Sequence, residues 1–195
     1  MKRYAHFLLG ASLVALLCSC NPGTTVATDG GSVRATADKV TLRADGHPTA
    51  HIEADGSFLI DGKKVEVTPQ QQALLQEYQR EFDAMTQQGI AIGKQGAAMA
   101  GKAVTAAIKG AMGGDGETLE KKMKAEGELI TQEALKLCQR LVVIRGVQDK
   151  LAVDLIAFKP YATIDMADVQ DCNGSAEDAV NDAMQQTGPI EPEAT

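Results

Sequence analysis

The sequence predicts an α+β fold, in which a small antiparallel β-meander packs against two long helices. Three observations predict it. Asp-Gly pairs recur between short apolar segments, as they do in hairpin turns. Apolar and polar residues alternate across residues 39–67, and two later stretches carry apolar residues at helical spacing. The chain has 195 residues, of which 44% are apolar and 23% charged, which fits one folded domain rather than a set of membrane spans.

The N-terminus resembles a bacterial lipoprotein signal. A cationic start, Lys2-Arg3, precedes an apolar run over residues 7–17 that is too short to cross a bilayer. The segment Leu17-Cys18-Ser19-Cys20 then resembles a lipobox. We therefore expect residues 1–19 to be a signal peptide and Cys20 to be acylated, so that several acyl chains hold the protein at a membrane. An ordinary secretory signal that is cut elsewhere is the alternative.

The residues after Cys20 bear on location and on the linker. Sorting rules known for enterobacterial lipoproteins make Asp after the acceptor cysteine an inner-membrane retention signal. Asn21 stands there instead, which favours the outer membrane, facing the periplasm. Residues 20–38 are rich in Gly, Thr, Ala and Asp and have almost no apolar periodicity, so we expect a flexible tether.

The region from residue 39 to residue 67 is predicted to be the sheet. Asp-Gly pairs supply turn residues, because Gly adopts a positive φ without strain. Apolar residues alternate between these turns as in a sheet with one buried face. Four strands are expected, at about 39–43, 49–53, 57–60 and 63–67, with turns at Asp45-Gly46, Asp55-Gly56 and Asp61-Gly62.

A helix is predicted from Pro69 to about Gln88. Thr68 is a suitable N-cap, Pro69 fits the first helical position, and Gln71 completes a capping box. The large apolar residues of this stretch fall on one stripe, and the buried face of the sheet is the expected partner of that stripe. Its members are Leu74, Leu75, Tyr78, Phe82 and Met85.

Residues 89–116 leave three interpretations open. They include eight Gly and eight Ala, and glycine weakens a helix by up to about 1 kcal/mol relative to alanine. As a helix, the segment would place Lys94, Lys102 and Lys109 within an arc of about 80°. It could be a loosely helical connector, a small-residue helix packed on the domain, or a helix on a membrane surface.

A second long helix is predicted from Glu117, with Gly146 as a point of bending or breakage, up to Pro160. Its apolar stripe indicates helix-on-helix packing. Tyr161 to Cys172 is expected to be extended or turn-like. The single domain would therefore cover residues 39–172, and residues 173–195 would form a short helix and a disordered acidic tail.

The cysteines predict a disulfide. Once Cys20 is acylated, only Cys138 and Cys172 remain in the mature chain, and an oxidising periplasm would join them. The bridge would close a loop of about 34 residues and pin the C-terminal segment to the long helix. A redox-active pair is the alternative, although the chain has no Cys-x-x-Cys motif.

Other chemistry is weakly supported. His47 and His51 could share one face of a strand, but solvated hairpin residues explain them better than a metal site. No Gly-x-Ser-x-Gly turn or Gly-Lys-Ser/Thr loop is present. We expect no catalytic residues, no metal and no cofactor. The net charge of −7 argues against nucleic-acid binding.

Several segments together resemble the YggN-like family of secreted Gram-negative proteins of unknown function. The resemblance implies compartment and fold and adds no activity; its strongest part is an Asp-Gly hairpin that leads into a helix. The lipobox departs from that family, which includes members with non-lipidated signals. The segments are Ile52 to Val65, Thr68 to Gln71, Tyr78 to Glu81, and, as compatible pieces, Leu137 to Val142 and Phe158 to Ala162.

These observations favour a periplasm-facing lipoprotein with a structural or protein-interaction role in the cell envelope, partnered by the membrane through its lipid and by an envelope protein. Two alternatives stay open. One is a carrier of an apolar ligand, which a deep cavity lined by Phe58, Tyr78 and Phe82 would favour. The other is an envelope hydrolase, or a redox enzyme that uses Cys138 and Cys172.

Overall fold

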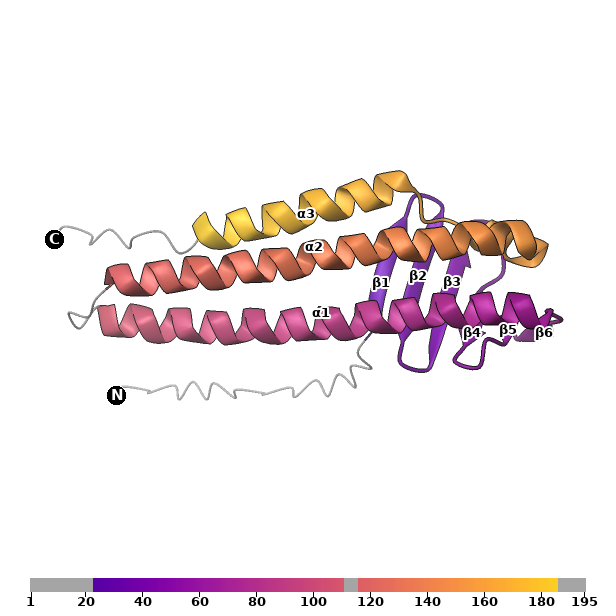
Figure 1. The fold of residues 1–195 in the computed structure, drawn as a ribbon, viewed down its shortest axis with the longest axis horizontal. Coiled ribbons are helices and arrows are strands. Elements are labelled where there is room, and N and C mark those ends of the chain that lie inside the picture. The colour runs from indigo at the N-terminus through magenta and orange to yellow at the C-terminus, as the bar shows by residue number, and fades with distance from the viewer. Residues whose placement is uncertain (1–22, 111–115, 186–195) are drawn as a thin grey trace, which may run out of the picture.

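The computed structural model describes residues 23–110 and 116–185 and has two layers, a six-stranded antiparallel sheet and a layer of helices (Figure 1). The predicted α+β class is therefore confirmed. The strands are β1 Gly23–Thr28, β2 Gly31–Thr36, β3 Lys39–Ala44, β4 Ala50–Glu53, β5 Phe58–Ile60 and β6 Lys63–Val65. The helices are α1 Pro69–Gly110, α2 Gly116–Asp154, the 3-10 helix η1 Ile156–Tyr161, and α3 Met166–Gln185.

The sheet is a meander in which neighbouring strands are consecutive in the sequence. All four strands predicted from the alternating pattern are present, as β3 to β6. Between β5 and β6, Asp61 has φ 51° and Gly62 has φ 70°, as in the two-residue turn that suits the twist of a hairpin. The Asp-Gly signal therefore identified real turns.

The prediction of a flexible tether over residues 20–38 is wrong for residues 23–36, which form β1 and β2. The two strands pair along their whole length, from Gly23 opposite Thr36 to Thr28 opposite Gly31. Apart from Arg34, their side chains are small, and Thr and Val are favoured in strands. The alternation therefore involves too few large apolar residues to be conspicuous, although Asp29-Gly30 gives the same turn signal as the later hairpins.

The N-terminus of α1 has the predicted capping box. The Thr68 backbone N–H donates to Gln71 Oε1 at 2.9 Å, and the Gln71 backbone N–H donates to Thr68 Oγ1 at 3.2 Å. The helix does not end near Gln88 but continues to Gly110. Of the three interpretations of residues 89–116, the structure confirms a small-residue helix packed on α2 as far as residue 110, while contact of this helix with a membrane stays a prediction; residues 111–115 lie outside the described part.

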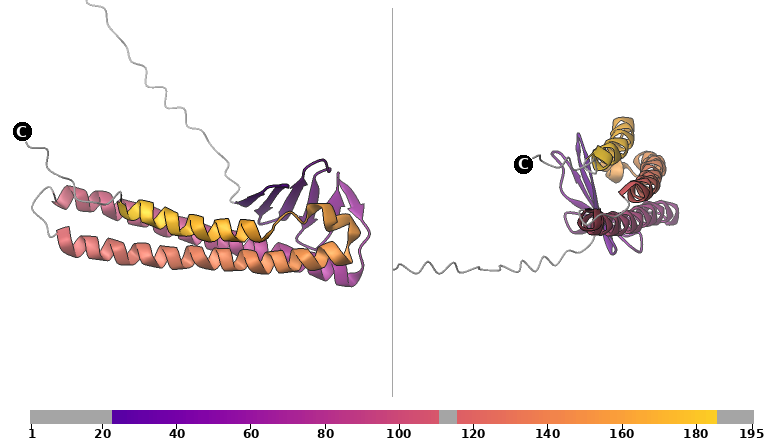
Figure 2. Two further views of the ribbon diagram at one scale, coloured as in Figure 1. Left: turned by 90° about the horizontal axis from the view of Figure 1, so that it is seen from above. Right: turned by 90° about the vertical axis from the view of Figure 1, so that its left-hand side faces the viewer.

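The helices α1 and α2 form a long antiparallel hairpin that extends past β1, the edge strand of the sheet (Figure 1). We call the projecting part, residues 88–110 and 116–133, the arm. Polar contacts join its two helices: Gln88 Nε2 donates to the Glu133 carbonyl oxygen at 3.2 Å, and Lys102 pairs with Glu126 at 2.6 Å. Seen from above, all helices lie on one side of the sheet, so its other face is uncovered (Figure 2).

The C-terminal half corrects two predictions. First, α2 runs through Gly146 without a break and ends at Asp154, and Pro160 lies inside η1. Second, residues 161–172 are not all extended, because α3 begins at Met166 and continues to Gln185. The folded unit therefore starts before residue 39 and passes residue 172. Residues 186–195, predicted to be a tail, lie outside the described part.

The turn between β4 and β5 docks on the first turns of α1. The Asp55 carbonyl oxygen accepts hydrogen bonds from the side-chain amides of Gln72 and Gln76, both at 2.8 Å. Gly56 has φ +78°, and a Cβ there would lie 2.7 Å from the Gln72 carbonyl oxygen. Glycine is therefore required both by the backbone conformation and by the closeness of the helix.

This contact gives a testable prediction. Gly56→Ala should lower the free energy of unfolding by about 2–4 kcal/mol, because a left-handed conformation costs roughly 1–2 kcal/mol and the steric clash adds to it. Gly46→Ala is the matched control, since Gly46 has φ +74° and no heavy atom lies within 4 Å of the position that a Cβ would occupy there. Urea unfolding of both variants measures the difference, and equal losses would contradict the docking contact.

Candidate functional site

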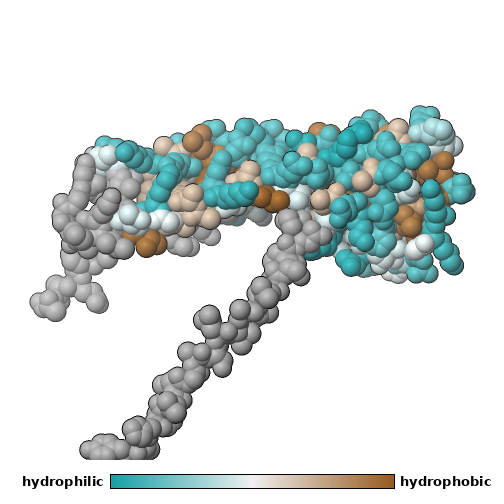
Figure 3. Space-filling view, turned by 90° about the horizontal axis from the view of Figure 1, so that it is seen from below, coloured by the Kyte–Doolittle hydropathy of each residue, from teal (hydrophilic) through white to brown (hydrophobic). Residues whose placement is uncertain are grey.

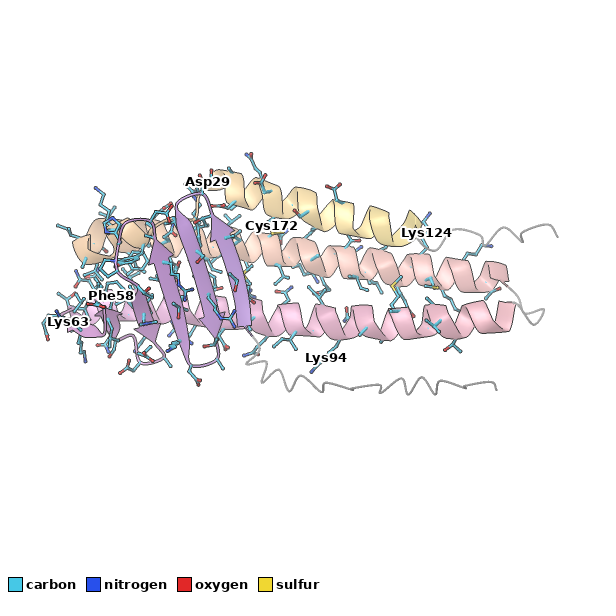
Figure 4. The ribbon with its side chains drawn as sticks, turned by 180° about the vertical axis from the view of Figure 1, so that it is seen from behind. Asp29, Phe58, Lys63, Lys94, Lys124 and Cys172 are labelled. Carbon is cyan, nitrogen blue, oxygen red and sulfur yellow. A yellow bond between two sulfur atoms is a disulfide. The ribbon has the colours of Figure 1, made fainter. Side chains whose placement is uncertain are left out.

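The predicted lipid-attachment residue, Cys20, lies outside the described residues. The other predicted pair, Cys138 and Cys172, forms a disulfide with a Cα–Cα distance of 5.6 Å. It joins α2 to α3, and Cys172 is labelled at this junction in Figure 4. Cys138 is 2% exposed. The predicted disulfide is therefore confirmed as a connection between two helices, buried at Cys138 and partly buried at Cys172.

The chain beside this bridge is fixed by buried hydrogen bonds. The Gln148 side chain donates to the Ile164 carbonyl oxygen at 2.8 Å and accepts from the Ile164 backbone N–H at 3.1 Å. Asp165 then caps α3, accepting from the backbone N–H groups of Ala167 at 2.7 Å and Asp168 at 3.0 Å. This Asp-x-x-Asp pattern is a sequence signal that could have located the start of α3.

The aromatic residues named for the carrier interpretation are packed against one another. Phe58, Tyr78, Phe82 and Phe158 are each 0% exposed. Ring centroids lie 5.0 Å apart for Tyr78–Phe82, 5.7 Å for Tyr78–Phe158 and 5.8 Å for Phe58–Phe158. These distances are those of direct aromatic contact, so the rings fill the space between sheet and helices instead of lining a deep cavity.

Two tyrosine hydroxyls differ within this core. Tyr161 Oη donates to the Pro48 carbonyl oxygen at 2.7 Å, which ties η1 to the turn before β4. Tyr78 Oη is buried and has no hydrogen-bond partner within the described part of the chain. Burial raises the pKa of the Tyr78 hydroxyl, so it stays protonated and serves as a packing group.

The uncovered face of the sheet carries a row of polar residues. Register places Arg34 opposite Thr41, Thr41 opposite His51, and His51 opposite Leu59. Thr41 Oγ1 lies 3.2 Å from His51 Nδ1. Partial burial lowers the pKa of His51, and the nearby charges of Lys39 and Arg43 lower it further. The two histidines are not brought together as a site, because His47 lies in a turn, where its ring contacts Tyr161.

A shallow, open hollow lies at the edge of this face, beside the turn between β4 and β5. The Asp55 carboxylate accepts from the Ser57 backbone N–H at 2.8 Å and from Ser57 Oγ at 3.0 Å. These hydrogen bonds lower the pKa of Asp55. The lowered pKa is therefore explained by the turn itself. Within residues 23–110 and 116–185, no group of three or more His, Cys, Asp or Glu side chains is arranged to hold a metal ion. The hollow is lined by Ala37, Asp38, Glu53, Ala54, Asp55, Ser57, Leu59 and Lys64.

The helices expose two surfaces: an aliphatic one on α2, which was not identified from the sequence, and a cationic one on α1, of which the sequence indicated Lys94 and Lys102. On α2, Val142 is 46% exposed and Val153 is 79% exposed, and their spacing of three turns places them on one side of the helix. On α1, Arg80, Lys94 and Lys102 are exposed cations. Figure 3, which views the α1 side, has its most apolar residues in separate spots among polar ones. Among the described helices, none is long and apolar enough to span a bilayer.

Comparison with known proteins finds a match to a protein family whose function is unknown. Residues 28–119 match the family model described as a protein of unknown function, DUF2884. The match begins at the end of β1 and covers the other five strands and α1. No curated protein and no solved structure matches the chain.

The disulfide gives a prediction. Thiol labelling of the denatured, unreduced mature protein should modify neither Cys138 nor Cys172, and prior reduction should expose both. Replacing both residues with Ala should lower the free energy of unfolding by about 3–4 kcal/mol, because the bridge restricts the unfolded chain. Labelling of both cysteines without reduction in material from the periplasm would show that the bridge is absent.

His51 gives a second prediction. Because its pKa in the folded protein is below 6.5, the unfolded chain binds the proton more readily, so His51 should reduce stability progressively as the pH falls below about 6.5. The stability of the wild type relative to His51→Gln should therefore decrease between about pH 7.5 and about pH 5.5 in thermal unfolding. His47→Gln, which leaves His51 in place, is the matched control. A constant difference across this range would contradict the lowered pKa.

Proposed function

We propose that this protein is a bacterial lipoprotein anchored through Cys20, facing the periplasm, with a structural or protein-interaction role in the cell envelope. The observation that carries the proposal is the N-terminal pattern, in which a cationic start and an apolar run lead to Leu17-Cys18-Ser19-Cys20. The disulfide between Cys138 and Cys172 supports it, since stable disulfides are typical of oxidising compartments. Asn21 after the acceptor favours the outer membrane.

The family comparison is consistent with the finer assignment to the YggN-like family. The hairpin at Ile52 to Val65, the capping segment at Thr68 to Gln71 and the helical segment at Tyr78 to Glu81 all lie inside the matched residues 28–119. These segments build the sheet and its contact with α1. What the resemblance supports is therefore a shared architecture, without an activity.

The filled aromatic core favours an interaction role over a carrier role. A carrier needs a cavity large enough for its ligand, whereas Phe58, Tyr78 and Phe82 are in close contact with their neighbours. The aliphatic side chains that α2 and η1 expose are better candidates for contact with a protein partner. They are Leu129, Val142, Val143, Val153 and Ile156.

The burial of Cys138 favours a structural role for the disulfide over a catalytic one. Reactive cysteines lie in accessible, electropositive surroundings, whereas Cys138 is 2% exposed and packed between helices. Cys172 also comes after Ile164 and Asp165 in the chain. The hydrogen bonds between Gln148 and Ile164 and the cap at Asp165 already hold the start of α3 in place without the bridge. The proposal therefore assigns no catalytic residue to this pair.

Acylation is tested by replacing the acceptor. Cys20→Ala should abolish incorporation of labelled palmitate and leave the signal peptide attached, because the cut depends on prior modification of the cysteine. Cys18→Ala is the matched control and should be acylated and processed like the wild type. Gel mobility and metabolic labelling measure both steps. A processed, soluble Cys20→Ala protein of wild-type size would refute the lipoprotein assignment.

A further inference from the structure

The corrected start of the fold leaves very little chain between the proposed anchor and the sheet. Only Asn21 and Pro22 separate Cys20 from Gly23, the first residue of β1. Three residue steps of extended chain span at most about 11 Å. If Cys20 is acylated, the first residue of β1 must therefore lie close to the lipid headgroups, with no long tether to separate fold and membrane.

The anchor point lies between the two ends of an elongated molecule. β1 runs across α1 at a point between the two ends of that helix, and the arm projects beyond β1 (Figure 1). Met85 is the last α1 side chain in the buried core. From there α1 continues for about 38 Å to Gly110 in one direction and about 24 Å to Pro69 in the other, at 1.5 Å per residue. A molecule standing on either end would hold β1 farther from the membrane than the chain can reach.

The side of the molecule on which β1 begins is formed by α1. In Figure 4, Lys94 points away from α2 and α3 on the side where α1 passes the start of β1. Contacts between α1 and β1 are present, whereas α3 packs on α2. A molecule whose long axis lies along the membrane would therefore bring the exposed side of α1 to the surface and keep α3 away from it.

The charge on this side of α1 suits anionic headgroups. Residues 84–110 contain no Asp or Glu, in a chain whose net charge is −7. The acidic residues of α1 all precede this stretch and are half-exposed: Glu81 pairs with Arg140 at 2.7 Å, and Glu77 and Asp83 lie one helical turn to either side of Arg80. Within the described part of the chain, Arg80 and Lys94 take part in no ion pair.

Two further observations limit the mode of contact. The turns at the end of the sheet where β1 begins carry Asp38 and Asp55, so the favourable charge belongs to α1 and not to the sheet. The α1 side has no continuous band of strongly apolar residues among those that the structure describes (Figure 3). Contact at the level of the headgroups is therefore expected, without insertion among the acyl chains.

We propose that the anchored protein lies with its long axis along the membrane and rests the exposed side of α1, through Lys94, on anionic phospholipid headgroups. The inference depends on the acylation of Cys20 proposed above. In this orientation α1, a helix rich in small residues, provides the membrane-facing surface. The aliphatic side chains of α2 and the acidic helix α3 then face the periplasm.

The test measures how close three positions come to the bilayer. The acylated full-length mature protein, reconstituted in phosphatidylethanolamine/phosphatidylglycerol vesicles, receives a single new cysteine at Ala73, Ala98 or Asp178, all of which are exposed. Each is labelled with a donor dye, and an acceptor is placed on the lipid headgroups. We expect high energy transfer from both α1 positions, Ala73→Cys and Ala98→Cys, and low transfer from Asp178→Cys on α3.

The electrostatic part is tested separately. In the Ala98→Cys background, we expect the arm to exchange between a position on the membrane surface and a position away from it. Lys94→Gln should lower the ratio of the first population to the second about fivefold, as expected for the loss of one cation near an anionic membrane. Lys94→Arg should keep the wild-type transfer. High salt or phosphatidylcholine vesicles should lower transfer from Ala98→Cys without releasing the protein.

Each other outcome refutes a different statement. High transfer from one α1 position alone would mean an upright molecule, and transfer unchanged by salt and by lipid charge would exclude the headgroup contact. Transfer from Ala98→Cys only in native envelopes would identify a protein, instead of lipid, as the occupant of the α1 side. Release of the protein from the vesicles in high salt would refute the acylation of Cys20. Failure of the proposed orientation is a different result, because the protein would then stay bound to the vesicles.

Discussion

Contact between the inner face of the sheet and α1 is the interaction on which the rest of the structure depends. A six-stranded meander with one apolar face cannot remain exposed to water, and the largest side chains that cover it are Tyr78, Phe82 and Phe158. Aromatic contacts of this kind contribute about 0.5–1.5 kcal/mol each beyond the burial of their area. Because Phe58 reaches the same cluster from β5 while Phe158 reaches it from η1, one group of rings connects the sheet, α1 and the chain that follows α2. The Tyr161 hydrogen bond to Pro48 then fixes that last connection to the sheet.

The sequence was most informative where a local rule and the tertiary fold agreed. The Asp-Gly turns and the Thr68–Gln71 capping box were predicted because each depends on a few adjacent residues, and both were found. β1 and β2 were missed because their inward positions hold few large apolar residues; the burial of Val33 and Ala35 is caused by the neighbouring strands and α1. The start of α3 was missed for a different reason. The cap formed by Asp165 and Asp168 is a local signal that could have located it, whereas the chain just before the cap is held by Gln148, a residue of α2 whose role only the folded chain reveals.

Candidate sites were predictable only as far as their chemistry could be read from residue types. The disulfide followed from the number of cysteines and the expected compartment, and its geometry agrees with that expectation. Surfaces could not be predicted in the same way, because exposure depends on which helix covers which. Val142 and Val153 lie outside the predicted apolar stripe of α2, whose members include the buried Ile144 and Leu151. A periodic pattern therefore identifies the core side of a helix, but it does not indicate whether apolar residues off the stripe form a contact surface.

Burial in the hydrophobic core contributes less to the stability of the arm than to that of the rest of the molecule. The arm lies beyond the sheet, and its α1 half contains five glycines between residues 89 and 110, each of which weakens a helix relative to alanine by up to about 1 kcal/mol. Small residues let the two helices approach closely, as at Gly127, where a Cβ would lie 3.7 Å from the end of the Met99 side chain. Stability therefore comes from packing of the two helices along the hairpin and not from burial of large side chains, and the exposed Lys102–Glu126 ion pair adds little to it. Because large apolar groups are few, the described outer surface of the arm is mainly polar, and the cations left on α1 determine what kind of surface it can meet.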